Sequence, residues 1–281
     1  MYFNGDKLHR IKFSKVNLDT PVDDILDNVR VNAQRHLPQA RPYPTNDIRV
    51  CLVGGGPSLD DTVDELRDQF DRGHKVVALN NSADWCLDHG IRPSAHVILT
   101  ARQCSLDWVN WDIPSNNGVK CKYFIASQVI PELFDKLEGR DVYMFHCVNG
   151  LGEKEILDDQ YLTPYFWVIG GSTVCLRAIG LFRLLGFQFF DLYGIDSCYM
   201  GDKHHAYAQP DGEGKETNNV LCAERTFKMS ATMVSQADDF MRFVKANGDH
   251  FNLNVHGDGV LAHIVSMGAQ YYEQGLSSPA E

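Results

Sequence analysis

The sequence predicts a three-layer α/β fold, in which helices cover both faces of a mostly parallel sheet. From Ile48 onward, short β-rich runs alternate with segments of helical periodicity, as is typical of β-α-β units. The predicted strands are near residues 49–53, 75–79, 96–99, 122–126, 141–146 and 188–193. The predicted helices are near residues 60–71, 83–89, 129–138 and 172–185. The length of 281 residues, 44% of them hydrophobic, is enough for one large core.

The expected domain organisation is one α/β domain over residues 46–265 with an addition at each end. Residues 1–45 are predicted to be a helical extension that ends in the Pro-rich linker LPQARPYPTND, and residues 266–281 a tail. Within the domain, residues 208–219 are polar and contain glycine, so they are predicted to be a mobile loop that closes as a lid. Residues 220–247 carry a long helical pattern, and FNLNV at 251–255 is one more possible strand.

Composition excludes several classes of protein. No run approaches the roughly 18 to 20 apolar residues that span a bilayer, and MYFNGDKLHR lacks the apolar core of a signal peptide, so we expect a cytoplasmic protein. The eight cysteines form no CxxC pair and no Cys/His metal spacing, which favours buried free thiols. A net charge of −11 disfavours nucleic acid as a partner, and any anionic ligand must be held by local donors. The oligomeric state stays open.

The stretch CLVGGGPSLDDT, at residues 51–62, places a glycine-rich turn after the first strand of the predicted domain. Such a turn lets the backbone approach a phosphate at the carboxyl edge of a sheet. Leu59 stands where a dinucleotide fingerprint has its third glycine, and the second strand ends in Asn80 and Asn81 rather than an acid, which disfavours an NAD enzyme. The residues expected at the ligand are Gly54, Gly55, Gly56, Pro57 and Ser58.

This turn also has a purely structural interpretation. Ser58 and Asp61 match an S-x-x-D capping box, so the serine hydroxyl would satisfy only helix N–H groups. Asp60 and Asp61 would also repel a phosphate at that helix end. We therefore expect ligand contact through the glycine backbone and not through the helix terminus.

A second turn, GGSTVCLRAIGLF at residues 170–182, is predicted to be the better anion site. Ser172 or Thr173 can start its helix, Gly171 precedes them, and no acid lies in the first turn, which predicts an uncompensated positive end. We accordingly expect this helix end, and not the one at Ser58, to hold the most negative phosphate. The alternative is an ordinary Ser/Thr cap on a buried helix.

Acid and base groups gather in GIDSCYMGDKHHAY, residues 194–207, after the strand QFFDLYG. His204 or His205 could deprotonate an acceptor hydroxyl, and Asp196 could orient the base or bind ribose or a metal. The alternative is a solvated polar loop, and the spacing matches no established metal site. Asn80, Asn81 and Thr100 follow neighbouring strands and could line the same crevice, although turn chemistry alone also favours Asn at strand ends.

Four segments together resemble the MptE-like family. They are VCLVGGGPSLDD, VVALNNSADWCLDHGIRPSAHVILT, GGSTVCLRAIGLFRLLGFQFFDLYGID and DKHHAY. That family is named after archaeal 6-hydroxymethylpterin diphosphokinase and includes the central domain of bacterial motility accessory factors. The pattern also resembles the family 42 sialyltransferases, with their GPSL turn and GID strand end. The resemblance covers residues 48 to about 207.

The resemblance implies a Rossmann-like, or GT-A-like, nucleotide-binding domain and a set of residue roles. Gly54, Gly56, Pro57 and Ser58 would approach the donor phosphate, Asn80 and Thr100 would lie by the nucleotide, Ser172 and Thr173 would face phosphate, and Asp196 would close the pocket.

At two places this sequence differs from the pattern of these families, so neither family's specific reaction can be carried over directly to this chain. The acidic patch that holds magnesium in the diphosphokinases reads LTARQ here, and the segment NNVLCAERTFKMS lacks the base histidine of the sialyltransferases. We expect a transferase that uses a nucleotide-sugar donor. The alternatives are an ATP-dependent pyrophosphokinase, for which magnesium is possible, and a non-catalytic nucleotide-binding or assembly module.

Overall fold

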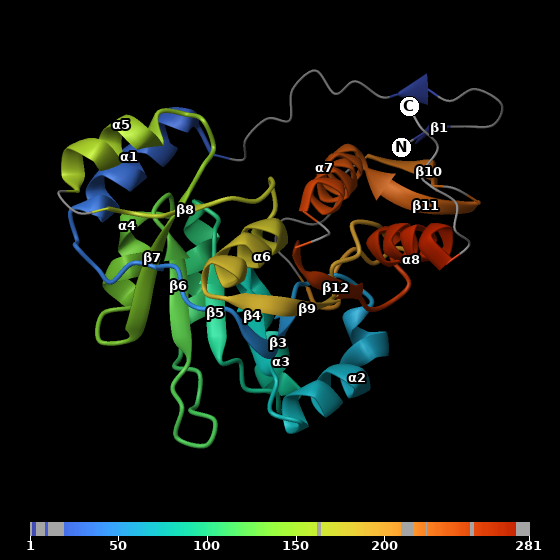
Figure 1. Cartoon of the computed structure of the whole chain (residues 1–281), viewed down its shortest axis with the longest axis horizontal. Helices are drawn as coiled ribbons and strands as arrows, with labels where there is room; N and C mark the ends of the chain where they lie inside the picture. The colour runs from blue at the N-terminus through green and yellow to red at the C-terminus, as the bar shows by residue number, and fades with distance from the viewer. Residues whose placement is uncertain are drawn as a thin grey trace.

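The computed structural model describes residues 2–3, 9–10, 20–161, 164–208, 216–222, 224–247 and 250–273. Its centre is an eight-stranded parallel sheet of order β12-β9-β3-β4-β5-β6-β7-β8 (Figure 1). The strands are β3 (Asn46–Val53), β4 (Lys75–Leu79), β5 (Ala95–Ile98), β6 (Lys122–Ala126), β7 (Asp141–Cys147), β8 (Trp167–Val168), β9 (Phe187–Tyr193) and β12 (Asn252–Val255). The predicted Rossmann-like α/β fold is confirmed, including the strand at 251–255.

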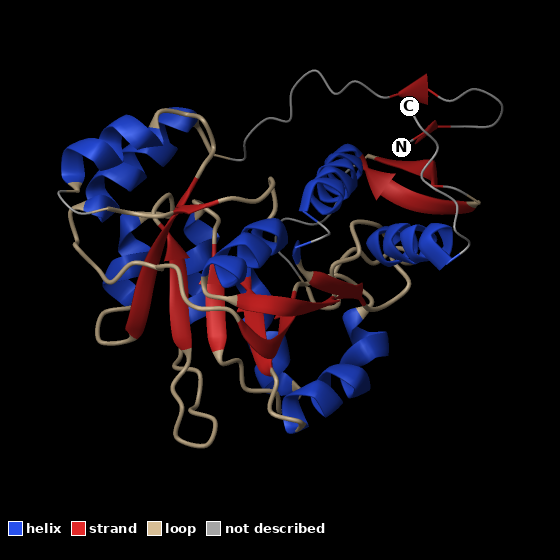
Figure 2. Ribbon diagram, viewed as in Figure 1, coloured by secondary structure: helices blue, strands red, loops and turns tan. Residues whose placement is uncertain are grey.

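Helices cover both faces of this sheet, as Figure 2 shows. The helices are α1 (Val22–Ala33), α2 (Leu59–Asp71), α3 (Ala83–Asp88), α4 (Pro131–Lys136), α5 (Glu153–Gln160), α6 (Val174–Leu184), α7 (Ala231–Asn247) and α8 (Val260–Glu273), with 3-10 turns at Asn80–Ser82 and Gln103–Val109. The side-chain alternation of β3 explains the layers. Cys51 and Val53 belong to the core shared with α2 and α3, whereas Val50 and Leu52 belong to the core shared with α6.

The N-terminal helix α1 packs against α4 and α5 at the β7 side of the sheet. Its buried Asn32 donates from Nδ2 to the carbonyl oxygens of Ser127 and Val129, at 3.0 and 2.7 Å. These bonds satisfy backbone groups just after β6, so α1 is fastened to the end of a central strand. The expected domain boundaries at residues 45 and 265 stay predictions.

The expected long helix over residues 220–247 is wrong in its first third. Residues Thr217–Cys222 form β10 and Arg225–Ser230 form β11, an antiparallel hairpin, and helix α7 begins only at Ala231. Val220 and Phe227 face each other across the ladder and are both buried. Apolar residues at these two positions are compatible with a helical pattern and with a strand pattern. The pairing of β10 with β11 decides in favour of the strands. The hairpin continues, through β1 (Tyr2–Phe3) and β2 (His9–Arg10), into a second, four-stranded sheet.

The loop expected over residues 208–219 ends earlier than predicted, because residues 217–219 already belong to β10. Residues 209–215, the centre of the expected lid, lie outside the described residues. All eight cysteines are free thiols, and six of them are buried, as expected. In the described part of the chain, no helix is both long and apolar enough to cross a membrane.

Candidate functional site

A cavity of about 460 Å³ lies where β3, β4, β5 and β9 reach their carboxyl ends, beside the start of α6. This volume is within the range of small-molecule sites. Most of the predicted site residues line it, namely Gly54, Gly55, Gly56, Asn80, Asn81, Thr100, Ser172, Thr173, Asp196, His204 and His205. Pro57, Ser58 and Gly171 do not line it.

The glycine turn is packed tightly against the loop that follows β9. The Gly54 N–H donates to the Tyr193 carbonyl oxygen at 2.8 Å, and the Gly56 N–H donates to that of Gly194 at 2.7 Å. A Cβ atom on Gly56 would lie 2.3 Å from Oδ2 of Asp196 and 2.8 Å from the Gly194 carbonyl oxygen. Close packing of the chain on itself therefore already requires glycine here, whether or not a ligand approaches the turn.

The capping box expected at the start of α2 is absent, because the Ser58 side chain makes no capping hydrogen bond. The Ser58 N–H instead donates to Oδ2 of Asp196, at 2.9 Å. Burial of Asp196 raises the pKa of its carboxyl, while this N–H lowers it and the negative charges of Asp61 and Asp258 raise it further. A carboxylate from a distant strand end thus compensates the first turn of α2, which sequence spacing could not show.

The start of α6 is also compensated, contrary to expectation. Thr173 is the N-cap, and its side chain accepts the Leu176 N–H at 3.3 Å; the first turn of the helix contains no acid. Asp239 of α7, however, accepts hydrogen bonds from the N–H and the hydroxyl of Ser172, at 2.6 and 2.8 Å. The carboxylate comes from another helix, so the positive end of α6 already has a negative partner.

His205 is held against the glycine turn in a defined tautomer. Its Nδ1 lies 3.0 Å from the Gly55 carbonyl oxygen, which also accepts the Ala206 N–H at 3.0 Å. Because a carbonyl oxygen only accepts, Nδ1 carries a proton in this hydrogen bond, which makes Nε2 the basic nitrogen when the ring is neutral. The Tyr207 hydroxyl donates to Oδ1 of Asn81 at 2.9 Å, which fastens the same loop to the end of β4.

His204 also lines the cavity, and its ring centroid lies 4.4 Å from that of His205. The structure therefore brings both predicted bases to the same wall of the cavity as the glycine turn. For His205, the hydrogen bond to the Gly55 carbonyl oxygen indicates which ring nitrogen can accept a proton.

Asn80 and Ser197 have left-handed backbone conformations beside the cavity, with φ values of 51° and 50°. The Asn80 side chain accepts the Leu99 N–H through Oδ1 at 3.1 Å, and its carbonyl oxygen contacts Nε2 of His96. These bonds join the ends of β4 and β5 and maintain a conformation that is costly for a residue with a side chain. Such local strain is typical of functional sites.

The family model of 6-hydroxymethylpterin diphosphokinase MptE-like proteins matches residues 23–202, which is more than half of the chain. This chain belongs to the MptE-like family. A search of curated proteins finds no match to this MptE-like protein.

Its fold is similar to that of the MAf glycosyltransferase from Magnetospirillum magneticum AMB-1, with a TM-score of 0.64 and 17% sequence identity, over 87% of this chain and 38% of the glycosyltransferase. A mammalian sialyltransferase in complex with Gal-beta-1-3GalNAc-ortho-nitrophenol has a TM-score of 0.41 and 11% identity, over 84% of this chain and 79% of that one. The MptE-like protein thus spans well under half of the length of the MAf glycosyltransferase.

Arg102 is a cavity residue of this MptE-like protein that the sequence patterns did not indicate. It is half-buried in the segment between β5 and the 3-10 turn at Gln103–Val109, and its Nε donates to the Thr100 hydroxyl at 3.3 Å. Among the described residues that line the cavity, Arg102 is the only Lys or Arg and Asp196 the only Asp or Glu. The sequence could have indicated Arg102, because it belongs to the segment LTARQ, which stands where the diphosphokinase resemblance implies an acidic patch.

The donor set of the described residues does not fit the magnesium that the diphosphokinase resemblance implies. Over the described residues, no group of three or more His, Cys, Asp and Glu side chains could hold a metal ion. Asp196, the sole described carboxylate of the cavity, already accepts the Ser58 N–H. Magnesium prefers octahedral oxygen coordination with one or two carboxylates, and this wall offers a guanidinium instead.

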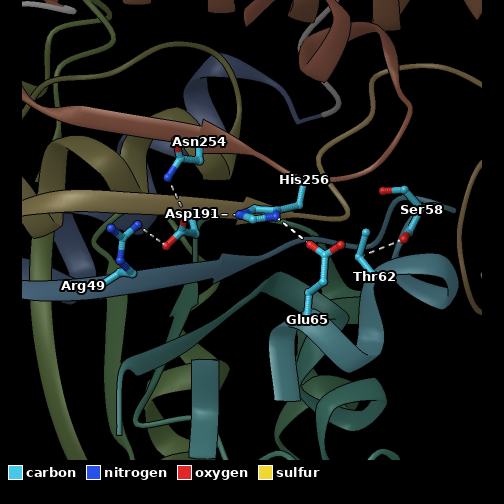
Figure 3. Close-up of polar contacts among 7 residues, drawn as sticks. All are labelled: Arg49, Ser58, Thr62, Glu65, Asp191, Asn254 and His256. Carbon is cyan, nitrogen blue, oxygen red and sulfur yellow. Dashed lines mark hydrogen bonds and ion pairs between the residues drawn. The ribbon is translucent and has the colours of Figure 1, made fainter. Parts of the chain in front are cut away.

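A separate polar cluster lies between β3, β9, β12 and α2 (Figure 3). Asp191 accepts hydrogen bonds from Arg49, Asn254 and His256, at 2.6, 2.8 and 3.2 Å. Burial by itself would raise the Asp191 pKa, but these bonds outweigh it and lower the pKa to about 2. His256 also contacts Glu65 at 2.9 Å, so this cluster fastens the edge strand β12 to the strand β9 and to α2.

Proposed function

We propose that this MptE-like protein is a transferase that binds a nucleotide-linked phosphate donor and transfers a sugar from it to a hydroxyl group. The observation that carries the proposal is the position of His205. A histidine whose tautomer leaves Nε2 able to accept a proton lines one cavity with a glycine turn and with the amides of Asn80 and Asn81. Base, phosphate-binding backbone and nucleotide-binding amides are the groups that such a transfer needs.

In the proposed step, Nε2 of His205 accepts the proton of the acceptor hydroxyl. The acceptor oxygen forms a bond to the anomeric carbon of the donor sugar, and the bond from that carbon to the phosphate oxygen breaks. The nucleotide phosphate leaves with the bonding electron pair, and the imidazolium then releases its proton to solvent. Every atom of donor and acceptor is accounted for without an oxidant or a reductant.

Further roles within this proposal follow the resemblance. Asn80, Asn81 and Thr100 would contact the nucleotide, and the backbone of Gly54 to Gly56 would lie by the phosphate. Asp196 would position the glycine turn through the Ser58 N–H. Since both helix ends hold carboxylates, Thr173 is proposed to contact the donor through its hydroxyl proton, and Ser172, whose hydroxyl donates to Asp239, lines the cavity beside it.

The test is a screen of nucleotide sugars for hydrolysis and for transfer, followed by two histidine variants. His205→Asn keeps an N–H donor for the Gly55 carbonyl oxygen but removes the base, so turnover should fall roughly 100- to 10,000-fold while donor binding persists. His204→Asn is the matched control and should lower turnover far less. Equal losses in both variants would contradict the assignment of His205.

The same screen separates the two alternatives. Membership of the MptE-like family favours ATP as a substrate, so ATP with magnesium and a hydroxymethylated pterin is included, and release of AMP would support pyrophosphoryl transfer. Binding of a nucleotide without turnover of any donor would support a non-catalytic nucleotide-binding module.

A further inference from the structure

Gln128 is a residue of the cavity lining to which the resemblance gives no role. It follows β6, and its Nε2 donates to the carbonyl oxygen of Leu99 at 3.1 Å, so it lies beside the end of β5. Strands β3 and β6 are three strand spacings apart in the sheet, which is roughly 14 Å. A phosphate at the glycine turn after β3 is therefore out of reach of Gln128, and the part of the nucleotide that lies beside this residue is the end remote from that phosphate.

Two neighbours fix the orientation of the Gln128 amide. An arginine side chain only donates, and Nη2 of Arg177 bonds to Oδ1 of Asn149 at 2.8 Å, so Nδ2 of Asn149 is free to donate in turn. It donates to Oε1 of Gln128 at 2.9 Å. The carbonyl oxygen of Leu99 only accepts, which independently requires the same orientation. Nε2 of Gln128 carries a second hydrogen, for which no acceptor lies among the described residues, so one N–H is left for a ligand in the cavity.

Arg177 strengthens this donor. Its side chain is buried and has no carboxylate partner in the described part of the chain, because its other bonds go to the carbonyl oxygens of Val168 and Val148, at 3.0 and 2.9 Å. The charged donor polarises Asn149, which in turn polarises Gln128, since hydrogen bonds in a chain reinforce one another. The remaining N–H of Gln128 is therefore a better donor to an oxygen atom than the N–H of an isolated amide.

An aromatic side chain lies at the same end of the cavity. Trp108 is a half-buried residue of the cavity lining and belongs to the 3-10 turn Gln103–Val109. This turn packs against α4, the helix that begins three residues after Gln128, and Nζ of Lys136 in α4 donates to the Leu106 carbonyl oxygen at 2.9 Å. Nucleobases stack on aromatic side chains with little regard to the identity of the base, so selection of one base must come from the polar groups beside the ring.

We propose that this end of the cavity binds the nucleobase of the donor, which stacks on Trp108 and accepts a hydrogen bond from Gln128 through a carbonyl oxygen. Guanine, hypoxanthine and the pyrimidines carry a carbonyl oxygen, whereas adenine carries an amine and no carbonyl group. An amine would place its N–H groups against the N–H of Gln128, and a buried donor without an acceptor is unfavourable. The substrate is accordingly a nucleotide with a keto base. The presence of a nucleotide rests on the proposed function, and the inference adds which base that nucleotide carries.

The test is calorimetric titration of the full chain with IMP and with AMP, which carry a carbonyl oxygen and an amine, respectively, at the same carbon of the purine ring. The parent should bind IMP at least about fivefold more tightly than AMP, and Gln128→Met should bring this ratio to within about twofold of one. Asn28→Ala is the matched control, because Nδ2 of Asn28 donates at 3.1 Å to the backbone carbonyl oxygen of Gln128 and not to its side chain. The ratio should be unchanged in this control.

A second pair of variants tests the stacking. Trp108→Leu should weaken the binding of both nucleotides at least about fivefold, because the aromatic surface is lost. Trp111→Phe changes an exposed tryptophan outside the cavity lining and should bind both nucleotides like the parent. Thermal unfolding without ligand shows whether each variant is folded. If Gln128→Met does not fold, Gln128→Glu takes its place, because it also removes the N–H at this position.

AMP binding to the parent as tightly as IMP would overturn the inference, and so would a parent that binds neither nucleotide. A ratio of the two affinities that Gln128→Met leaves unchanged would also overturn it, even if a nucleotide sugar is turned over, and the proposed function would then stand. A parent that shows the expected ratio but transfers no sugar from any nucleotide sugar would support the base subsite and contradict the proposed function.

Discussion

The close packing of the glycine turn makes Gly56→Ala a sharp test of the site geometry. The new Cβ would lie 2.3 Å from Oδ2 of Asp196 and 2.8 Å from the backbone carbonyl oxygen of Gly194. A carbonyl oxygen at the end of β9 cannot move without disturbing the sheet, so the Asp196 carboxylate must shift. That shift breaks its 2.9 Å hydrogen bond to the Ser58 N–H.

Two costs add up in this variant. Losing a hydrogen bond to a charged group destabilises by about 1.5 to 3 kcal/mol, and forcing an extra carbon into a packed region costs typically about 1 to 3 kcal/mol. We expect Gly56→Ala to lower the free energy of unfolding by roughly 2.5 to 6 kcal/mol. Gly55→Ala should cost less, because its Cβ would meet only side-chain atoms, with the Tyr207 hydroxyl oxygen at 2.7 Å and Nδ1 of His205 at 3.1 Å.

The assay is urea unfolding followed by circular dichroism at neutral pH, with both alanine variants and Asp196→Ala. The double variant Gly56→Ala with Asp196→Ala should lose less stability than the sum of the single variants, because the second change removes the colliding oxygen. A Gly56→Ala protein within about 0.5 kcal/mol of the parent would refute the close approach, since surface changes without a structural role fall in that range.

Four further variants test groups that the fold places in unusual surroundings. His146 is buried, neither ring nitrogen has a hydrogen-bond partner among the described residues, and burial lowers its pKa from 6.5 to about 4. As the pH falls between these values, the unfolded chain takes up the proton first and the folded state loses stability. In urea unfolding, His146→Leu should therefore recover up to about 3 kcal/mol of unfolding free energy at pH 4 relative to pH 7.5. The pKa of His256 is raised, because the hydrogen bonds to its two carboxylate partners outweigh burial. Its ion pairs therefore stabilise the fold fully below pH 6.5, and this stabilisation is lost as the pH rises through the raised pKa. His256→Gln should lower the melting temperature more at pH 5.5 than at pH 8.5. Tyr207→Phe leaves the Asn81 amide oxygen without its donor and should cost about 1 to 3 kcal/mol in urea, and an unchanged midpoint would argue against this bond. Asp239→Asn removes the carboxylate at the start of α6 and should cost about 0.3 to 1 kcal/mol, while any nucleotide affinity measured by calorimetry should stay equal or rise.

Local periodicity was sufficient to predict the central sheet. The last four residues of β3, Val50 to Val53, are all buried and form a short continuous apolar run, and helix α2 shows period 3.6 because it buries one face. The polar residues that line the cavity were predictable for the same reason. In a parallel sheet, residues that directly follow successive strands gather at one edge, which brought Gly55 and Asn80 together.

The charges at the two helix ends could be decided only by the tertiary structure. Sequence spacing indicated a capping box at Ser58 and an uncompensated end at Thr173, yet Asp196 and Asp239, both distant along the chain, supply the carboxylates. The hairpin β10–β11 was missed for a related reason, since apolar residues at Val220 and Phe227 satisfy either period until a strand pairs with them. Capping and dipole arguments use only neighbours within one turn, whereas electrostatic interactions and strand pairing depend on distance in space. The sequence by itself therefore determined the layers of the fold and the edge at which the cavity opens, and the packing of α7 and of the loop after β9 decided which charges face an anion there.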